Sequence, residues 1–119
     1  MNYSKYNFTI NPKIEEVMNS FSEKWRKESM FRFCNLMINL IETDKNILNF
    51  STTSLCVKIK KHELDIIAHF FKMNCLDNLH KFLNYENSWT IKEVLMFLLS
   101  QETDSEIRLK IIDVLEQGN

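Results

Sequence analysis

The sequence predicts an all-α fold, a compact right-handed stack of antiparallel helices. Apolar residues recur at helical spacing over most of the 119 residues, and the chain contains one glycine and one proline. Hairpin turns and phosphate-binding loops depend on glycine, whereas helix interiors exclude both residues. The hydrophobic content of 45% is enough for one core. We therefore expect a single α-helical domain over residues 11–119, preceded by an N-terminal arm over residues 1–10.

The first predicted helix begins at Asn11-Pro12, because asparagine caps helices and proline suits their first turn. An amphipathic stripe follows, formed by Ile14, Val17, Met18, Phe21 and Trp25. The charged segment 22–29 predicts a bend or break. Residues 30–41 are apolar almost all round, which predicts a buried central helix. Residues 43–46 end this helix, and a short turn or helix is predicted at residues 47–50.

Residues 55–60 form an ambiguous segment. Leu55, Val57 and Ile59 alternate as in a strand, but no second strand-like segment is available to pair with them, so we predict a helix. Further helices are predicted over residues 62–73, 75–83 and 89–100, the last of these capped by Ser88. A capping box from Thr103 to Glu106 opens the final helix, which should end at Gly118.

The expected core residues lie on the main apolar stripes of these helices. They are Leu36, Phe71, Ile91, Leu95, Leu98 and Ile111.

The second half of the chain resembles armadillo and HEAT helical repeats. The segment FFKMNCLDNLHKFLNYENSWTIKEVLMFLLS is similar to one armadillo-type unit, with Leu76, Leu79 and Leu83 in its short helix, and SQETDSEIRLKIIDVLEQ is similar to a HEAT-type turn and helix start. The resemblance implies stacked helices that bind proteins. Asn74-Cys75 stands where armadillo units usually carry a glycine. Residues 40–62 resemble, more distantly, the N-terminal helical domain of transcription elongation factors.

Composition argues against several function classes. The net charge is −1 with acids and bases interspersed, so the chain lacks the basic footprint of a nucleic-acid binder. It contains no Walker, Rossmann or GxSxG motif, no secretory signal and no apolar run that could span a bilayer. Three cysteines, an odd number, indicate reduced thiols in an intracellular protein, cytoplasmic or nuclear. We expect no enzyme, no cofactor and no membrane partner.

Histidines and cysteines gather between residues 62 and 80. His62 and His69 lie two turns apart on one helix face, with Cys75 and His80 nearby. Structural zinc sites usually contain tight CxxC or HxxxH pairs, and these are missing, so we expect no bound zinc. Cys34 lies within the most apolar helix and should be inert.

Two faces stand apart from the core stripes. One lies on the predicted helix 89–100, and the other is the outer face of the last helix; either can bind a partner or pack within the bundle. The predicted partner-binding residues are Trp89, Lys92, Met96, Arg108, Leu109 and Ile112. The sequence thus favours a non-enzymatic interaction module, an adaptor or scaffold, that binds a partner peptide or helix or forms a homodimer. The alternative is a small regulatory bundle with a hydrophobic groove, of the elongation-factor or viral host-regulatory type.

Overall fold

Helices account for nearly all of the regular structure in this computed structural model. The structure describes residues 12–76 and 89–119, with side chains from residue 22 onward. The described elements are α1 (Pro12–Thr43), the 3₁₀ helix η2 (Ile47–Asn49), α2 (Thr52–Lys58), α3 (Lys61–Met73), α5 (Ile91–Gln101) and α6 (Ser105–Gln117). The all-α prediction is confirmed. The predicted arm at residues 1–10, the Ser88 cap and nearly all of the helix predicted at residues 75–83 lie outside the described residues.

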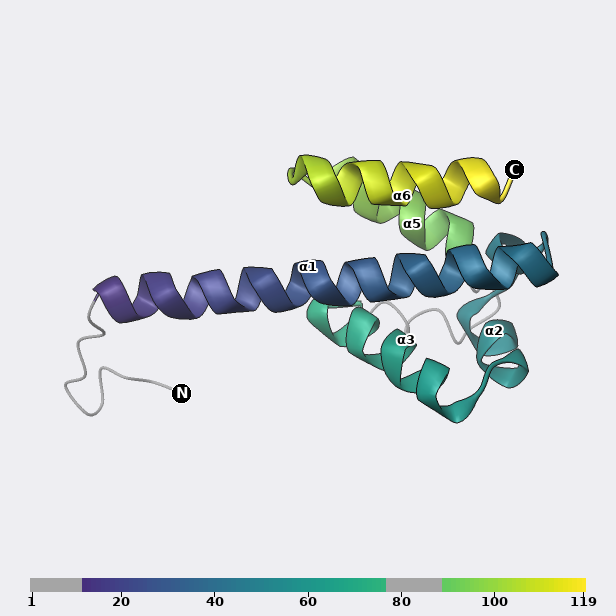
Figure 1. Cartoon of the computed structure of the whole chain (residues 1–119), viewed down its shortest axis with the longest axis horizontal. Helices are drawn as coiled ribbons and strands as arrows, with labels where there is room; N and C mark the ends of the chain where they lie inside the picture. Colours follow the sequence, from purple (N-terminus) through teal and green to yellow (C-terminus); the bar gives the residue numbers. More distant parts are fainter. Residues whose placement is uncertain (1–11, 77–88) are drawn as a thin grey trace.

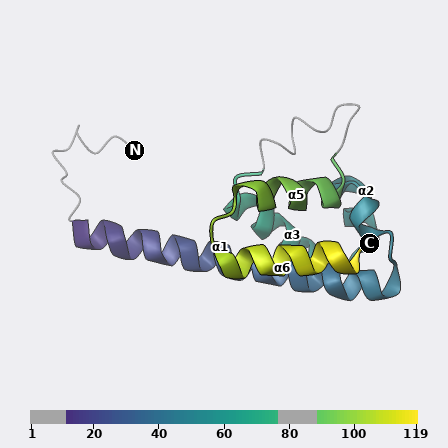
Figure 2. The same ribbon diagram turned by 90° about the horizontal axis from the view of Figure 1, so that it is seen from above.

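Helix α1 is the axis of the bundle. It packs against α3 on one side and α6 on the other, and α5 packs beside α6 (Figure 1). Helices α5 and α6 run antiparallel, joined by residues 102–104 (Figure 2). The 32 residues of α1 span about 48 Å at 1.5 Å per residue. Its N-terminal part extends beyond the other helices in both views.

The predicted break at residues 22–29 is wrong, because α1 runs through it without interruption. This segment holds no glycine or proline, and its Glu, Lys and Arg residues are good helix formers. Arg26 also pairs with Glu23 one turn earlier, at 3.1 Å. Trp25, predicted to lie on the core side of this helix, is 54% exposed.

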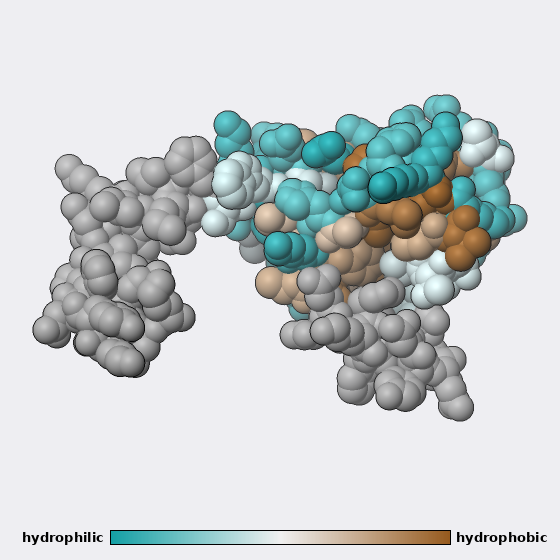
Figure 3. Space-filling view, turned by 90° about the horizontal axis from the view of Figure 1, so that it is seen from below, coloured by the Kyte–Doolittle hydropathy of each residue, from teal (hydrophilic) through white to brown (hydrophobic). Residues whose placement is uncertain are grey.

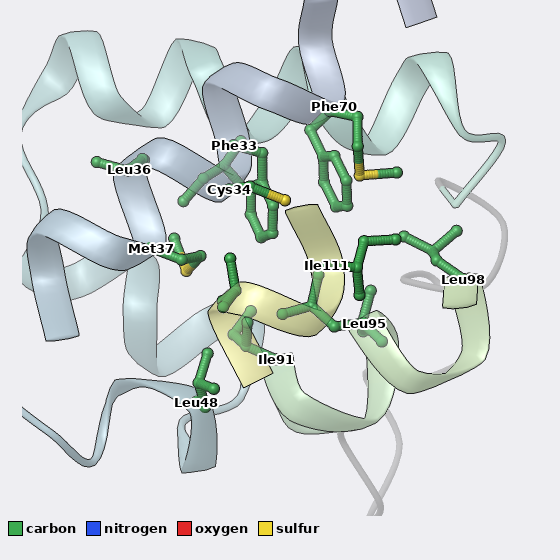
Figure 4. Packing of buried hydrophobic residues seen from close by; sticks show 14 of the residues in the cluster. Phe33, Cys34, Leu36, Met37, Leu48, Phe70, Ile91, Leu95, Leu98 and Ile111 are labelled. Atoms are coloured by element: carbon green, nitrogen blue, oxygen red, sulfur yellow. The ribbon is translucent and has the colours of Figure 1, made fainter. Parts of the chain in front are cut away.

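All of the core residues predicted above are buried, which confirms that prediction. Side chains from α1, α3, α5, α6 and η2 converge on one cluster (Figure 4). At its centre the rings of Phe33 and Phe70 stack with centroids 3.7 Å apart and planes 6° apart. Phe71 meets the Phe70 ring edge-on at 5.5 Å. The Phe33–Phe70 stack joins α1 to α3.

The ambiguous segment 55–60 is confirmed as helical through Lys58. Ser51 caps α2 by accepting a hydrogen bond from the Ser54 amide at 3.1 Å. Leu55 is fully buried while Val57 is exposed. In a strand these two residues would lie on the same face, so their different burial indicates a helix. Just before α2, Phe50 accepts a hydrogen bond from the Ile91 amide at 2.9 Å, which ties the start of α2 to the start of α5.

The last two helices begin one or two residues later than predicted. Helix α5 starts at Ile91 and is capped by Thr90, which forms a reciprocal capping box with Glu93. Helix α6 starts at Ser105, and its cap is Asp104 rather than Thr103. The Asp104 carboxylate accepts from two amides, those of Glu106 at 2.9 Å and Ile107 at 3.1 Å. A charged acceptor with two amides suits the positive helix end better than a threonine hydroxyl.

Helix α3 ends in a left-handed turn at Cys75, whose φ is 56°. The Leu76 amide donates to the Phe71 carbonyl at 2.8 Å, and the Cys75 amide donates to the Lys72 carbonyl at 3.2 Å. This is the Schellman pattern, in which glycine is the usual residue at the left-handed position. The left-handed residue of this turn is therefore a cysteine and not a glycine.

Replacing Cys75 with glycine is expected to raise the free energy of unfolding by up to about 1 kcal/mol. Glycine removes the cost of a left-handed side chain, about 1–2 kcal/mol, and this gain is partly offset by the greater freedom of glycine in the unfolded chain. Urea unfolding would measure the difference. Cys75→Ala serves as the control, because it removes the thiol but keeps the Cβ; an equal gain in both variants would contradict the conformational explanation.

Gly118 ends α6 as predicted, but for a different reason. Its φ of −83° is open to any residue. A Cβ at this position would overlap the side chain of Leu48, which is buried under the end of α6. Glycine is therefore required by the close approach of η2 and not by a left-handed turn.

The surface around α2 and α3 is mixed in character. Figure 3 views this face and shows apolar residues gathered in one area, with hydrophilic residues over much of the remainder. Val57, at 82% exposure, and the half-buried Ile59 and Ile66 contribute apolar surface from these elements. Within the described residues, no helix combines the length and the apolar character needed to cross a membrane.

Candidate functional site

A groove of about 520 Å³ lies between α5 and α6. Residues from both helices and from the C-terminal residue line it: Lys92, Met96, Leu99, Ser100, Arg108, Leu115 and Asn119. Three of the predicted partner-binding residues are therefore brought together, although the sequence placed them on two separate faces. The antiparallel packing of α5 on α6 merges those faces.

Helical spacing explains how α5 and α6 build the groove. Lys92, Met96 and Leu99 are four and three residues apart and share one side of α5, next to its core side. Arg108 and Leu115 are two turns apart on the facing side of α6. Met96 is 53% exposed, while Leu99 and Leu115 are half-buried. The groove thus has an apolar floor with a cation on each helix.

Arg108 is held in place by the end of α5. Its Nη1 donates to the Leu99 carbonyl at 2.6 Å and to the Glu102 carbonyl at 2.9 Å. These carbonyls are at the C-terminus of α5, where the helix dipole favours a cation. The sequence predicted Arg108 as a partner-binding residue, and in the structure two hydrogen bonds hold its guanidinium at the end of α5.

The other predicted binding residues take different positions. Trp89 does not line the groove; its ring meets Phe97 edge-on with centroids 5.5 Å apart. Leu109 is 67% exposed, and Ile112 is half-buried one turn after Arg108, beside the groove. Sequence reasoning missed Leu99 and Leu115 as groove residues. The spacing of Leu115, two turns after Arg108, was the signal that could have identified it.

A second hollow lies between α1 and α3. It consists of two adjoining spaces of about 440 Å³ and 350 Å³ that share Ser29, Arg32 and His69. The remaining lining residues are Trp25, Glu28, His62, Asp65 and Ile66. Ser29 is 2% exposed, and its hydroxyl has no hydrogen-bond partner among the described residues. We call this hollow the α1–α3 cleft.

His62 and His69 both line this cleft, as expected for residues on one helix face. Within residues 12–76 and 89–119, however, no group of three or more His, Cys, Asp or Glu side chains is arranged to hold a metal ion. The expected absence of zinc stays a prediction.

The three cysteines are free thiols. Burial raises the pKa of the Cys34 thiol to about 12, so it stays protonated at neutral pH. Burial also raises the pKa of Cys56, which is half-buried, whereas Cys75 is exposed. The surroundings of Cys34 and Cys56 therefore favour the protonated thiol over the reactive thiolate.

An ion-pair cluster fixes α1 to the α5–α6 connection. Arg26 contacts both carboxylate oxygens of Glu102, at 2.6 Å and 3.2 Å. The Glu102 side chain is 6% exposed and also accepts from the Thr103 and Asp104 amides. Lys27 pairs with Asp104 at 3.4 Å and with Glu106 at 3.1 Å. The bidentate Arg26–Glu102 pair is the strongest of these contacts because it is the least exposed.

Glu102→Gln is expected to lower the free energy of unfolding by about 1.5–3 kcal/mol at pH 7. The hydrogen bond from Arg26 lowers the pKa of Glu102, with the two backbone amides adding to this effect. Stabilisation from a lowered pKa is present at neutral pH and is lost as the pH falls through the folded-state value. The difference between native and variant should therefore shrink below about pH 4.

Urea unfolding at pH 7 and pH 3 measures this effect, with Glu42→Gln as the control. Glu42 is exposed on α1, and its replacement should change stability by less than about 0.5 kcal/mol. An equal loss for Glu102→Gln at both pH values would show that its charge contributes nothing.

Comparison of this chain with protein-family models, with curated proteins and with solved structures finds no match.

Proposed function

We propose that this chain is a non-enzymatic protein-interaction module that binds an amphipathic helix of another protein in the α5–α6 groove. The observation that carries the proposal is the groove itself, an apolar floor bordered by Lys92 on α5 and Arg108 on α6. Helix-in-groove recognition uses apolar side chains one turn apart on the bound helix. Such a helix would place them against Met96, Leu99 and Leu115.

The charges of the groove select the partner. Lys92 and Arg108 are both cations, and no acidic residue lines the groove among the described residues. A helix with acidic residues beside its apolar stripe is therefore the complementary partner, since opposite charges increase specificity and association rate. Met96 adds adaptability, because a flexible thioether side chain can repack against different apolar surfaces.

The antiparallel α5–α6 pair supports the resemblance to armadillo and HEAT units, which are also built from helix pairs. In this proposal the chain carries such a pair on the long helix α1, which covers one side of it. The function is then that of an adaptor, in which the bundle presents the groove and performs no chemistry.

Synthetic peptides of one length can test the groove against the full chain. An acidic amphipathic helix with leucines at positions i, i+3, i+4 and i+7 should bind, as measured by fluorescence anisotropy. A basic helix with the same leucines should bind at least about tenfold more weakly, because Lys92 and Arg108 repel it. An acidic peptide with scrambled leucines should not bind.

Two variants and a matched control locate the binding site. Met96→Ala removes an apolar contact, and Lys92→Glu reverses one charge; each should weaken binding of the acidic peptide at least about tenfold. Val57→Ala removes an exposed apolar side chain on α2 and should leave binding unchanged. Undiminished binding in both groove variants would overturn the proposal.

A further inference from the structure

The α1–α3 cleft contains a buried polar group that the described part of the chain leaves unsatisfied. Ser29 lines both spaces of the cleft and is 2% exposed. A serine inside a helix can donate to the carbonyl one turn earlier. The Ser29 hydroxyl, however, has no hydrogen-bond partner among the described residues. Because a buried hydroxyl without a partner is unfavourable, a molecule that enters the cleft and bonds to it is stabilised.

The cleft exists because its two helices diverge. Helices α1 and α3 meet at the stack of Phe33 on Phe70, and they separate toward the start of α3 (Figure 1). The larger space, of about 440 Å³, lies between them and reaches His62 in the first turn of α3. Pockets that hold small organic molecules have volumes of about 300–1,000 Å³. The larger space is therefore of a size to take a small molecule.

This larger space also carries two opposite charges that do not pair. Arg32 on α1 and Asp65 on α3 both line it, and both side chains are exposed. Neither takes part in an ion pair between described residues. A gap therefore separates the two charges, and a ligand can contact both of them at once.

Helical spacing places these groups together. Ser29 and Arg32 are three residues apart and share one face of α1. On α3, Asp65 and His69 are four residues apart, and Ile66 lies between them as a half-buried apolar side chain. The space is thus lined by a hydroxyl and a cation on α1 and by a carboxylate and an apolar side chain on α3.

We propose that the larger space of the α1–α3 cleft binds a small zwitterion with one carboxylate and one ammonium group, the class to which free amino acids belong. The ligand carboxylate accepts hydrogen bonds from the Ser29 hydroxyl and the Arg32 guanidinium. Its ammonium group donates to the Asp65 carboxylate, and its apolar part lies against Ile66. Hydrogen bonds between charged groups are the strong ones in such sites.

The charges of the cleft favour a zwitterion over an ion of one sign. A simple anion is attracted by Arg32 but repelled by Asp65, and by Glu28 in the adjoining space of about 350 Å³. A simple cation is repelled by Arg32. A ligand with both charges is complementary to both sides of the cleft.

Isothermal titration calorimetry of the full chain tests the ligand class. Glycine and L-leucine are the probes, each compared with its N-acetyl derivative, which lacks the ammonium group, and its amide, which lacks the carboxylate. At least one of the two amino acids should bind saturably. Its two derivatives should each bind at least about tenfold more weakly, since each loses a charge-assisted contact. Absence of saturable binding for both amino acids, or equal binding of either derivative, would overturn the proposal.

Two variants assign the ligand groups to the protein. Arg32→Gln and Asp65→Asn should each weaken binding of the amino acid at least about tenfold. Arg32→Gln should not weaken binding of the amide further, because the amide has no carboxylate. By the same argument, Asp65→Asn should not weaken binding of the N-acetyl derivative. Native affinity for the amino acid in either variant would contradict the proposed contacts.

Ser29→Ala separates a binding role from a structural one. Removal of an unpaired hydroxyl should leave the free energy of unfolding in urea unchanged or slightly raised. Binding of the amino acid should nevertheless weaken at least about fivefold, because the carboxylate loses a donor. Ser22→Ala, at an exposed position on the same helix, is the matched control and should bind normally. Full affinity in Ser29→Ala would show that the hydroxyl takes no part in binding.

Further controls separate this site from general electrostatics and from the α5–α6 groove. Lys45→Gln and Glu42→Gln each remove one exposed charge outside the cleft, and both should keep the native affinity for the amino acid. Losses there equal to those of Arg32→Gln and Asp65→Asn would overturn the proposal. Met96→Ala should also keep amino-acid binding, so this site and the helix-binding groove can be tested independently.

Discussion

Phe70→Ala is expected to lower the free energy of unfolding by about 3–5 kcal/mol. Phe70 is fully buried on α3 and stacks on Phe33 of α1 at a centroid distance of 3.7 Å. Truncation removes the ring from the contact that holds α3 to α1, and the surrounding helices can collapse only partly into the space. Domains of this size are stable by about 5–15 kcal/mol, so the loss is a large share of the total.

Urea unfolding followed by circular dichroism gives the measurement. Lys72→Ala, exposed on the same helix, is the matched control and should change stability by less than about 0.5 kcal/mol. Phe70→Leu keeps most of the volume and gives a milder variant in case the alanine protein does not fold. A loss below about 1 kcal/mol for Phe70→Ala would show that the stacked pair does not lie in a packed core.

Leu95→Ala is expected to lower the free energy of unfolding by about 2–5 kcal/mol. Leu95 is fully buried on the core side of α5, and it lies beside Ile91 and Leu98 in the cluster (Figure 4). Its neighbour Met96 points into the groove and is 53% exposed. Adjacent positions on one helix should therefore have different effects, one on stability and the other on binding.

Met96→Ala is the control for this prediction. It should change the free energy of unfolding by less than about 1 kcal/mol while it weakens peptide binding. A loss below about 0.5 kcal/mol for Leu95→Ala would place Leu95 on the surface and would reverse the assignment of the two faces of α5.

Most helices of this bundle could be predicted from local patterns. The stripe of Ile91, Leu95 and Leu98 identified the core side of α5, and the missing strand partner identified the segment at Leu55 as helical. These predictions succeeded because helical periodicity and backbone hydrogen-bond demands act within a few residues. Helix ends were predicted less well. Thr103 and Asp104 are both good N-cap residues, and only the structure shows that Asp104 caps α6.

The predicted break at residues 22–29 failed for a different reason. A run of charged residues looks like a connection between helices, but Arg26 and Lys27 find their acidic partners on the α5–α6 connection, more than 70 residues later. Those contacts depend on the packing of α6 against α1, which local sequence does not reveal.

By itself, the sequence determined that this protein is helical, which side of each helix is apolar and that Met96 lies off the core stripe of its helix. Only the tertiary structure decided which of those sides are covered. It joined Lys92 and Met96 with Arg108 in one groove, turned Trp89 against Phe97, and left Trp25 exposed on a helix longer than its neighbours. The physical reason is that periodicity fixes the direction of a side chain around its own helix axis, whereas burial depends on which other helix lies opposite.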